Sequence, residues 1–169
     1  AGQHIRQMKG RSMKTGLTRV TAGFMLAFMG FSTNAQQTTA DGDLVVEKAW
    51  TQATDTDNGS AAIYFTLRNT GQATIDLIGA RTQRASIEVL HKTEFDTSGT
   101  ARMSAVPELR GALGETLKLE PGGMHVMLID LEMPLVEGET LPLRLEFYDG
   151  DDITIDVPIL AADASGPQG

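Results

Sequence analysis

Two histidines and two methionines of this chain have side chains and a spacing that suit the binding of a metal ion. His91, Met103, His125 and Met127 follow the pattern H-x11-M-x21-H-x-M. Imidazole and thioether ligands suit copper, above all Cu(I), whereas Mg²⁺, Ca²⁺ and Mn²⁺ prefer oxygen and Zn²⁺ rarely takes a thioether. The chain has no cysteine, which excludes a blue-copper site built on a thiolate. The four residues therefore predict a Cu(I) site.

The first 35 residues differ from the rest of the chain. They carry six basic or histidine side chains and no acidic one, then the apolar run Val20–Phe31, and they end on the small residue Ala35. This pattern predicts a secretory signal peptide over residues 1–35, with extra residues ahead of a start at Met13. The apolar run is short of the roughly 20 residues that span a bilayer. With no cysteine for a lipid anchor, we expect a soluble protein exported to the periplasm.

Without that segment, residues 36–169 hold two histidines and four methionines, all between His91 and Met133. They also hold 9 Lys or Arg and 22 Asp or Glu, a net charge of −13. Such a surface repels nucleic acid and anionic lipid and favours cations or basic partners. Since disulfides are excluded, one apolar core has to stabilise the domain.

Short β-type runs separated by turn sequences predict about nine strands and no helix. The turns include Asp57-Asn58-Gly59, Asn69-Thr70-Gly71, Pro121-Gly122-Gly123 and Asp149-Gly150-Asp151. We expect an all-β antiparallel sandwich or small barrel, with Greek-key connections, over residues 44–160. Residues 36–43 are predicted to be flexible and residues 161–169 disordered. The predicted strands are Leu44–Trp50, Ala61–Arg68, Ile75–Arg81, Ser86–Glu94, Ala101–Val106, Glu115–Leu119, His125–Leu131, Thr140–Tyr148 and Ile153–Ile159.

These strands must position the ligands. His125 and Met127 lie two residues apart on one strand and therefore share a face. The preceding Pro-Gly-Gly turn puts His125 at a strand entry. We expect His91 at or near the end of its strand and Met103 at the start of the returning strand, so that a tight hairpin brings the two together.

Other interpretations compete with a metal site. Methionines in β-proteins usually fill cores, and a lone histidine is usually a surface or hydrogen-bonded residue. We assign Met124 and Met133 to packing, because neither has a histidine at same-face spacing. If the other methionines also only pack, the domain is a non-catalytic β-sandwich that mediates protein interactions in the cell envelope. An enzyme is disfavoured, because no G-x-S-x-G motif or marked carboxylate pair occurs and two histidines are too few for a copper oxidase.

The chain resembles the PCuAC family of periplasmic copper chaperones over roughly residues 44–160. His91, Met103, His125 and Met127 match its signature of a His, a Met twelve positions later, and His-x-Met after 21 intervening residues. Other matching segments are Ala49-Trp50-Thr51, Ala61–Asn69 (AAIYFTLRN), Ile87–His91 (IEVLH), Leu119–Leu131 (LEPGGMHVMLIDL), Pro134-Leu135 and Glu137-Gly138-Glu139.

The resemblance implies a cupredoxin-like sandwich that carries one Cu(I) ion per monomer. It also implies delivery to the copper-A centre of cytochrome c oxidase, alongside Sco-type thiol proteins. Family members often carry a methionine beside the first histidine, where this chain has Lys92. Some relatives add a second copper site in a C-terminal tail rich in His and Met, and this chain ends without such a tail.

Overall fold

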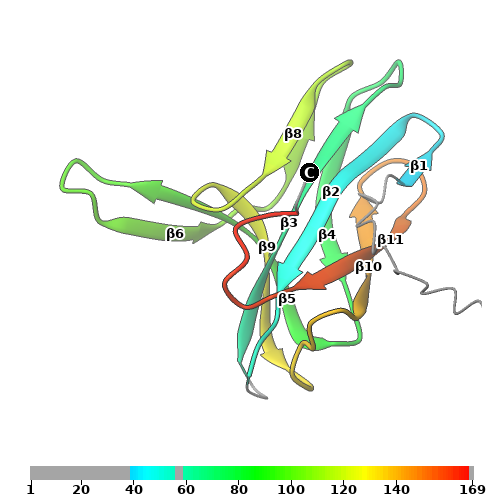
Figure 1. The fold of residues 1–169 in the computed structure, drawn as a ribbon. Coiled ribbons are helices and arrows are strands. Elements are labelled where there is room, and N and C mark those ends of the chain that lie inside the picture. Colours follow the sequence, from blue (N-terminus) through cyan, green and yellow to red (C-terminus); the bar gives the residue numbers. More distant parts are fainter. Residues whose placement is uncertain (1–38, 56–58, 168–169) are drawn as a thin grey trace, which may run out of the picture. The chain divides into compact units, whose positions relative to one another are not determined.

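The part of the chain described by the computed structural model, residues 39–55 and 59–167, contains eleven β-strands and no helix (Figure 1). No helix long and apolar enough to cross a membrane occurs in these residues. The strands are β1 (Thr39–Asp41), β2 (Leu44–Gln52), β3 (Ser60–Asn69), β4 (Ile75–Arg81), β5 (Ala85–Phe95), β6 (Ala101–Ala105), β7 (Leu109–Gly111), β8 (Thr116–Leu119), β9 (Met124–Leu131), β10 (Thr140–Phe147) and β11 (Ile153–Leu160).

The nine predicted strands are confirmed, each with its ends within two residues of the prediction. Two strands were missed. β1 lies in the segment 36–43 that was predicted to be flexible, and β7 lies between two predicted strands. Each of them is three residues long, too short to show an alternating pattern. The predicted signal peptide, residues 1–35, lies outside the described residues.

The strands form two layers that are joined along one edge. In the first layer, hydrogen-bonded neighbours run β6-β5-β9-β3-β2-β1, and β8 pairs with β3 just beside β9. In the second layer they run β11-β10-β4-β7. The layers meet where β11 pairs in parallel with β2, at Ile159 opposite Thr51 and Leu160 opposite Gln52. The predicted all-β sandwich is therefore confirmed.

One apolar core lies between the layers. Alternate residues of each strand point into it, as the sequence pattern requires. From the first layer come Ile63, Phe65 and Leu67 of β3, and from the second Leu141, Leu143 and Leu145 of β10, all at most 1% exposed. Burying each such side chain contributes roughly 1.5–3 kcal/mol, so the core stabilises the fold without disulfides.

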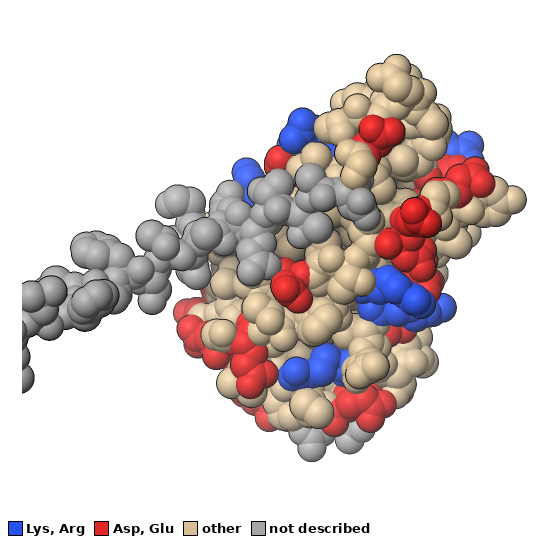
Figure 2. Space-filling model, turned by 90° about the vertical axis from the view of Figure 1, so that its right-hand side faces the viewer, with Lys and Arg blue, Asp and Glu red and all other residues tan. Residues whose placement is uncertain are grey.

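Charged side chains are interspersed over the surface. Figure 2 shows the side on which β1 and β11 lie in Figure 1, and basic groups there have acidic neighbours. Arg144 pairs with Glu146 (Nη2–Oε1 2.9 Å) and Arg81 with Glu88 (Nη1–Oε2 3.3 Å). Solvent-exposed arginines such as Arg144 contribute little to stability through their ion pairs. The core, and not the surface charge, therefore determines the fold.

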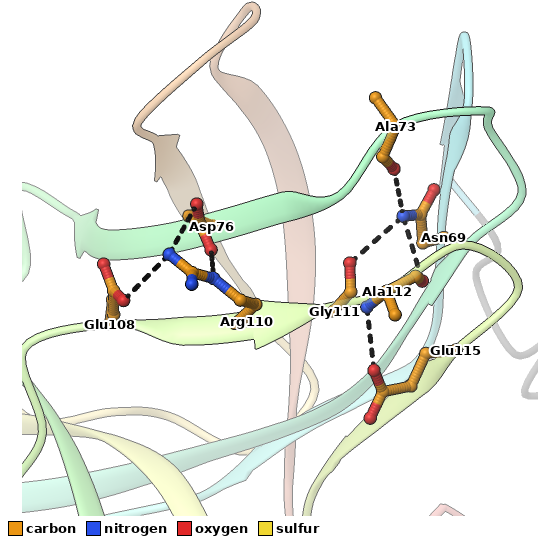
Figure 3. Close-up of polar contacts among 8 residues, drawn as sticks. All are labelled: Asn69, Ala73, Asp76, Glu108, Arg110, Gly111, Ala112 and Glu115. Atoms are coloured by element: carbon orange, nitrogen blue, oxygen red, sulfur yellow. Dashed lines mark hydrogen bonds and ion pairs between the residues drawn. The ribbon is translucent and has the colours of Figure 1, made fainter.

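Asn69, at the end of β3, joins several parts of the backbone (Figure 3). Its amide nitrogen donates hydrogen bonds to the carbonyl oxygens of Ala73 (2.7 Å), Gly111 (3.2 Å) and Ala112 (3.1 Å), and its oxygen accepts one from the Gly71 amide (3.0 Å). Asn69 is 1% exposed, so these bonds satisfy all its polar groups away from water. It thereby fixes the β3–β4 turn and the loop that leads into β8.

The C-terminal segment 161–167, part of the stretch 161–169 predicted to be disordered, lies against the body of the domain. It turns back from β11 across the outer face of the first layer (Figure 1). The Gln52 side-chain amide donates a hydrogen bond to the Ala164 carbonyl (2.9 Å). Ser165, Gly166 and Pro167 line a cavity together with Trp50. The polar composition of the segment suggested disorder, but the surface that it covers is partly apolar.

Candidate metal centre

The turn before His125 lies between two strands that pair with the same neighbour. β8 pairs with residues 65–68 of β3 and β9 with residues 60–63. Between them the chain makes a turn over residues 120–123, in which the Gly123 amide donates to the Glu120 carbonyl (2.9 Å). Gly122 has φ +78°, a conformation that favours glycine. The turn therefore starts β9 at Met124, and His125 lies at a strand entry as predicted.

β9 places His125 and Met127 on the outer face of the first layer. Val126 and Leu128 are fully buried in the core, and the residues that alternate with them point the other way. Even on this outer face His125 is only 4% exposed, because neighbouring side chains cover it. The shared face predicted for His125 and Met127 is confirmed.

His91 lies directly opposite His125 in the pairing of β5 with β9. The two imidazole rings meet edge to face, with their centroids 5.8 Å apart and an interplanar angle of 84°. The prediction that His91 lies at or near a strand end is wrong, because β5 continues for four residues to Phe95. This continuation is one arm of the hairpin that carries Met103.

Met103 lies on β6, which pairs with β5 in a hairpin that projects from the body of the sandwich (Figure 1). Met103 is opposite Thr93, and Ala105 is opposite His91, so Met103 and His91 are diagonal neighbours on one face. Met103 is 55% exposed. The tight hairpin predicted to bring the two together is confirmed, although Met103 lies in the middle of its strand.

Asp96 holds the hairpin turn together. Its side-chain oxygen accepts hydrogen bonds from the Ser98 hydroxyl and from the backbone amides of Ser98 (2.9 Å) and Thr100 (3.0 Å). The Ser98 hydroxyl and then the Thr100 amide lower the pKa of the Asp96 carboxyl, because both bond to its charged form. Gly99, with φ +82°, completes the turn.

The four predicted ligands thus lie on one face of three neighbouring strands, β6, β5 and β9. Met103, His125 and Met127 line one cavity of about 420 Å³, together with Tyr64 and Thr93. His91 does not line this cavity. Its position follows from its pairing with His125, which makes it a diagonal neighbour of Met127 as well.

Both histidines have a ring nitrogen that suits metal binding. His125 Nδ1 lies 3.2 Å from the Gly123 carbonyl oxygen, and donating its proton there leaves the Nε2 lone pair free. In many proteins, metal-bound histidines are oriented in the same way, by a hydrogen bond from the ring nitrogen that does not bind the metal. His91 Nδ1 is buried and has no hydrogen-bond partner among the described residues.

The surroundings of His125 favour its neutral, metal-binding form. Burial lowers the pKa of the ring, because a buried imidazolium loses hydration. The hydrogen bond to Gly123 opposes this effect, and repulsion from a charged His91 adds to it. The net result is a pKa below the ordinary value for histidine.

The other two methionines of the region do not join the site. Met124 points to the opposite face of β9 and packs against the core, and Met133 is half exposed beyond the end of β9. Sequence reasoning missed Tyr64, whose ring lies 6.2 Å from that of His125. The alternation of the buried Ile63 and Phe65 along β3 is the signal that could have placed Tyr64 on the outer face, but the pairing of β3 with β9 was not visible in the sequence.

The donor set favours a soft metal ion. The described residues contain no group of three or more His, Cys, Asp or Glu that could hold a metal. The side chains placed to add further ligands beside His91 and His125 are the thioethers of Met103 and Met127. Two imidazoles and two thioethers suit Cu(I), which prefers soft donors and accepts three or four of them.

A larger cavity, of about 650 Å³, lies elsewhere in the molecule and has a different chemistry. Its lining includes Arg81, Arg84 and Arg144, from β4, the turn after it and β10. Each arginine pairs with a carboxylate at its side, such as Glu146 for both Arg81 and Arg144. No imidazole or thioether lines this cavity, so it does not compete as a metal site.

The chain is similar to several known proteins. A family model described as "Putative lipoprotein LpqE-like" matches residues 44–159. "Putative lipoprotein Lxx21020" of Leifsonia xyli subsp. xyli is 36% identical over 120 residues, which are 71% of this chain and 70% of that protein.

Solved structures share the fold. The apo PCuAC domain of PmoF2 has a TM-score of 0.63 at 21% identity, over 78% of this chain and all of that one. The copper-bound PCuAC domain from PmoF2 has a TM-score of 0.61 at 20% identity, over 74% of this chain and 98% of that one. CuI-DR1885 from Deinococcus radiodurans is 32% identical, with a TM-score of 0.52 over 66% of this chain and 76% of that one.

Proposed function

Because this chain belongs to the LpqE-like family and has the fold of PCuAC domains, we propose that it is a copper carrier. It binds one Cu(I) ion per monomer through His91, Met103, His125 and Met127. It works outside the cytoplasm and catalyses no reaction. The relatives named as lipoproteins support a location in the cell envelope, as do the basic and apolar features of residues 1–35.

The main observation behind this proposal is the direct pairing of His91 with His125. Met103 on β6 and Met127 on β9 are both diagonal neighbours of His91 on the same face. The two relatives with copper in their descriptions, the PmoF2 domain and CuI-DR1885, have the same fold and support a copper cargo. The orientation of His125 by Gly123 supports a ring nitrogen that is free for the metal.

The donor types suit a carrier that releases its metal. Thioethers are neutral and bind copper less tightly than thiolates, and they are not lost to disulfide formation in oxidising compartments. Met103 is exposed on a projecting hairpin, where an acceptor can replace it as a ligand first. We propose delivery to the copper-A centre of cytochrome c oxidase, alongside Sco-type thiol proteins.

Competition with a chromophoric Cu(I) chelator tests the binding. We expect one Cu(I) per chain, and an X-ray absorption spectrum with both nitrogen and sulfur ligands. His125→Ala and Met127→Ala should each weaken binding by about 100-fold or more, since loss of an outer-sphere partner alone typically costs 10–100-fold. Met133→Ala is the matched control, because this half-exposed methionine lies outside the site.

Unchanged binding in both ligand variants would contradict the proposal and leave the alternative of an interaction module whose methionines only pack. Transfer is measured separately, by mixing the Cu(I)-loaded chain with a soluble copper-A domain and following the metal spectroscopically. Copper retained on the chain, with no loading of the acceptor, would contradict delivery while leaving the binding site intact.

A further inference from the structure

Tyr64 stands beside His125 on the outer face of the first layer. Ala62 of β3 pairs with Met127 of β9, and alternation puts the next outward residue, Tyr64, beside His125. The two ring centroids are 6.2 Å apart at 56°, while the His91 ring lies 5.8 Å away from His125 at 84°. With Nδ1 held by Gly123, the His125 ring is constrained by three different contacts.

Trp50 supports Tyr64 from the neighbouring strand. The two residues are directly opposite in the pairing of β2 with β3, and their ring centroids are 4.8 Å apart. Trp50 shares the outer face with Tyr64, yet it is only 5% exposed. Something beyond the sheet must therefore cover it.

The C-terminal segment 161–167 is what lies over Trp50. Ser165, Gly166 and Pro167 line a cavity of about 300 Å³ together with Trp50. The hydrogen bond from Gln52 to Ala164 fixes the segment to β2, and Gln52 itself lines the cavity of the proposed copper site. The segment thus faces Trp50 across this cavity, and the rings of Trp50, Tyr64 and His125 follow one another along the outer face.

We propose that Tyr64 is a positioning residue for His125, and that the C-terminal segment 161–167 holds Tyr64 in place through Trp50. This inference rests on the proposed function. The rings keep the imidazole in one orientation before the metal arrives, so binding does not have to immobilise it. The segment that composition marks as disordered thereby becomes part of the copper site.

The test compares Tyr64→Leu, which removes the ring, with Tyr64→Phe, which keeps it. An immobilised side chain is worth about 0.5–1.5 kcal/mol, so Tyr64→Leu should bind Cu(I) about three- to tenfold more weakly, with unchanged stoichiometry. Tyr64→Phe should bind like the original chain. Thermal unfolding establishes that both variants fold. Deletion of residues 161–169 should weaken binding in the same direction and shift the fluorescence of Trp50, the single tryptophan.

A measurement without copper separates this inference from the proposed function. In the metal-free chain, ¹H–¹³C relaxation of the His125 ring should report greater motion in Tyr64→Leu and in the deletion variant. Equal ring motion in all variants would overturn the inference even if the chain binds Cu(I). Equal weakening by Tyr64→Phe and Tyr64→Leu would also overturn it, because the hydroxyl and not the ring would then matter. If the original chain binds no Cu(I), the proposed function fails, and the relaxation data still decide the role of Tyr64.

Discussion

At the scale of single residues, the proposed ligands differ most in their solvent exposure and in how many groups contact them. His125 is 4% exposed and is contacted by two rings and a carbonyl, whereas Met103 is 55% exposed on β6, the strand at the edge of the first layer. A buried, oriented ligand gives affinity, and an exposed one on a flexible thioether gives a route for exchange. The proposed site therefore combines the imidazole of His125, whose orientation is fixed, with the thioether of Met103, which an acceptor's ligand can replace.

The lowered pKa of His125 predicts a pH-dependent stability. The unfolded chain protonates this ring near its ordinary pKa of about 6.5, whereas the folded chain does so only at lower pH. Between these two values unfolding takes up a proton, so the free energy of unfolding should fall as pH falls below about 6.5. Above that pH the contribution is complete and constant.

Urea unfolding of the metal-free chain at a series of pH values measures this effect. His125→Gln removes the titrating ring, and its free energy of unfolding should change less over the same range. Parallel pH profiles for the two proteins would contradict the assignment. Cu(I) binding should also weaken over this acidic range, because a protonated imidazole cannot bind metal.

At the scale of the elements, the site depends on how strands are ended and joined. The β8–β9 turn starts His125's strand, and Asp96 closes the hairpin that returns Met103 beside His91. Asn69 lies far from the ligands along the chain, but it fixes the loop before β8. We therefore expect a substitution at Asn69 to change the stability of the fold, and substitutions at the proposed ligands on β5, β6 and β9 to change metal binding.

Asn69→Ala should destabilise the fold without changing the site. Its loss removes four hydrogen bonds in a buried region, and the Ala112 carbonyl keeps the Glu115 amide as a donor, so we expect a loss of about 2–3 kcal/mol in the free energy of unfolding. The folded variant should still bind one Cu(I) with unchanged affinity. Arg110→Ala, which breaks surface ion pairs with Asp76 and Glu108, is the control, and it should cost less than about 1 kcal/mol. Equal losses for the two variants would contradict the role of Asn69.

At the scale of the whole molecule, charge and topology have separate roles. Residues 36–169 carry a net charge of −13, dispersed over the surface with local ion pairs (Figure 2). We propose that this charge disfavours nucleic acid and favours cations or basic partners, whereas the core determines the fold. The cavity of the proposed copper site and the C-terminal segment both lie on the outer face of the first layer, and Gln52 links them.

Salt should stabilise the metal-free domain. Repulsion among excess carboxylates opposes folding, and salt screens it over about 10 Å at 0.1 M. The Tm of the chain should therefore rise by a few degrees when sodium chloride is raised from about 10 mM to about 150 mM. A matched increase in glycerol, which does not screen charge, serves as the control for nonspecific stabilisation. A Tm that falls with salt would show that ion pairs outweigh the repulsion.

The candidate donors, the nine longer strands and the face shared by His125 and Met127 were all predictable from the sequence. These features follow from side-chain chemistry and from the two-residue period of a strand, which are local properties. Turn residues such as Gly122 and Gly150 likewise identified the places where the chain reverses.

The pairing of the strands could be learned only from the folded structure. The edge-to-face contact of His91 with His125, the place of Tyr64 beside them and the cover of Trp50 by residues 161–167 all join segments distant in sequence. No local pattern encodes such pairings, because they are selected by the burial of one shared core. The same global packing ordered a C-terminal segment whose own composition provides no reason for order.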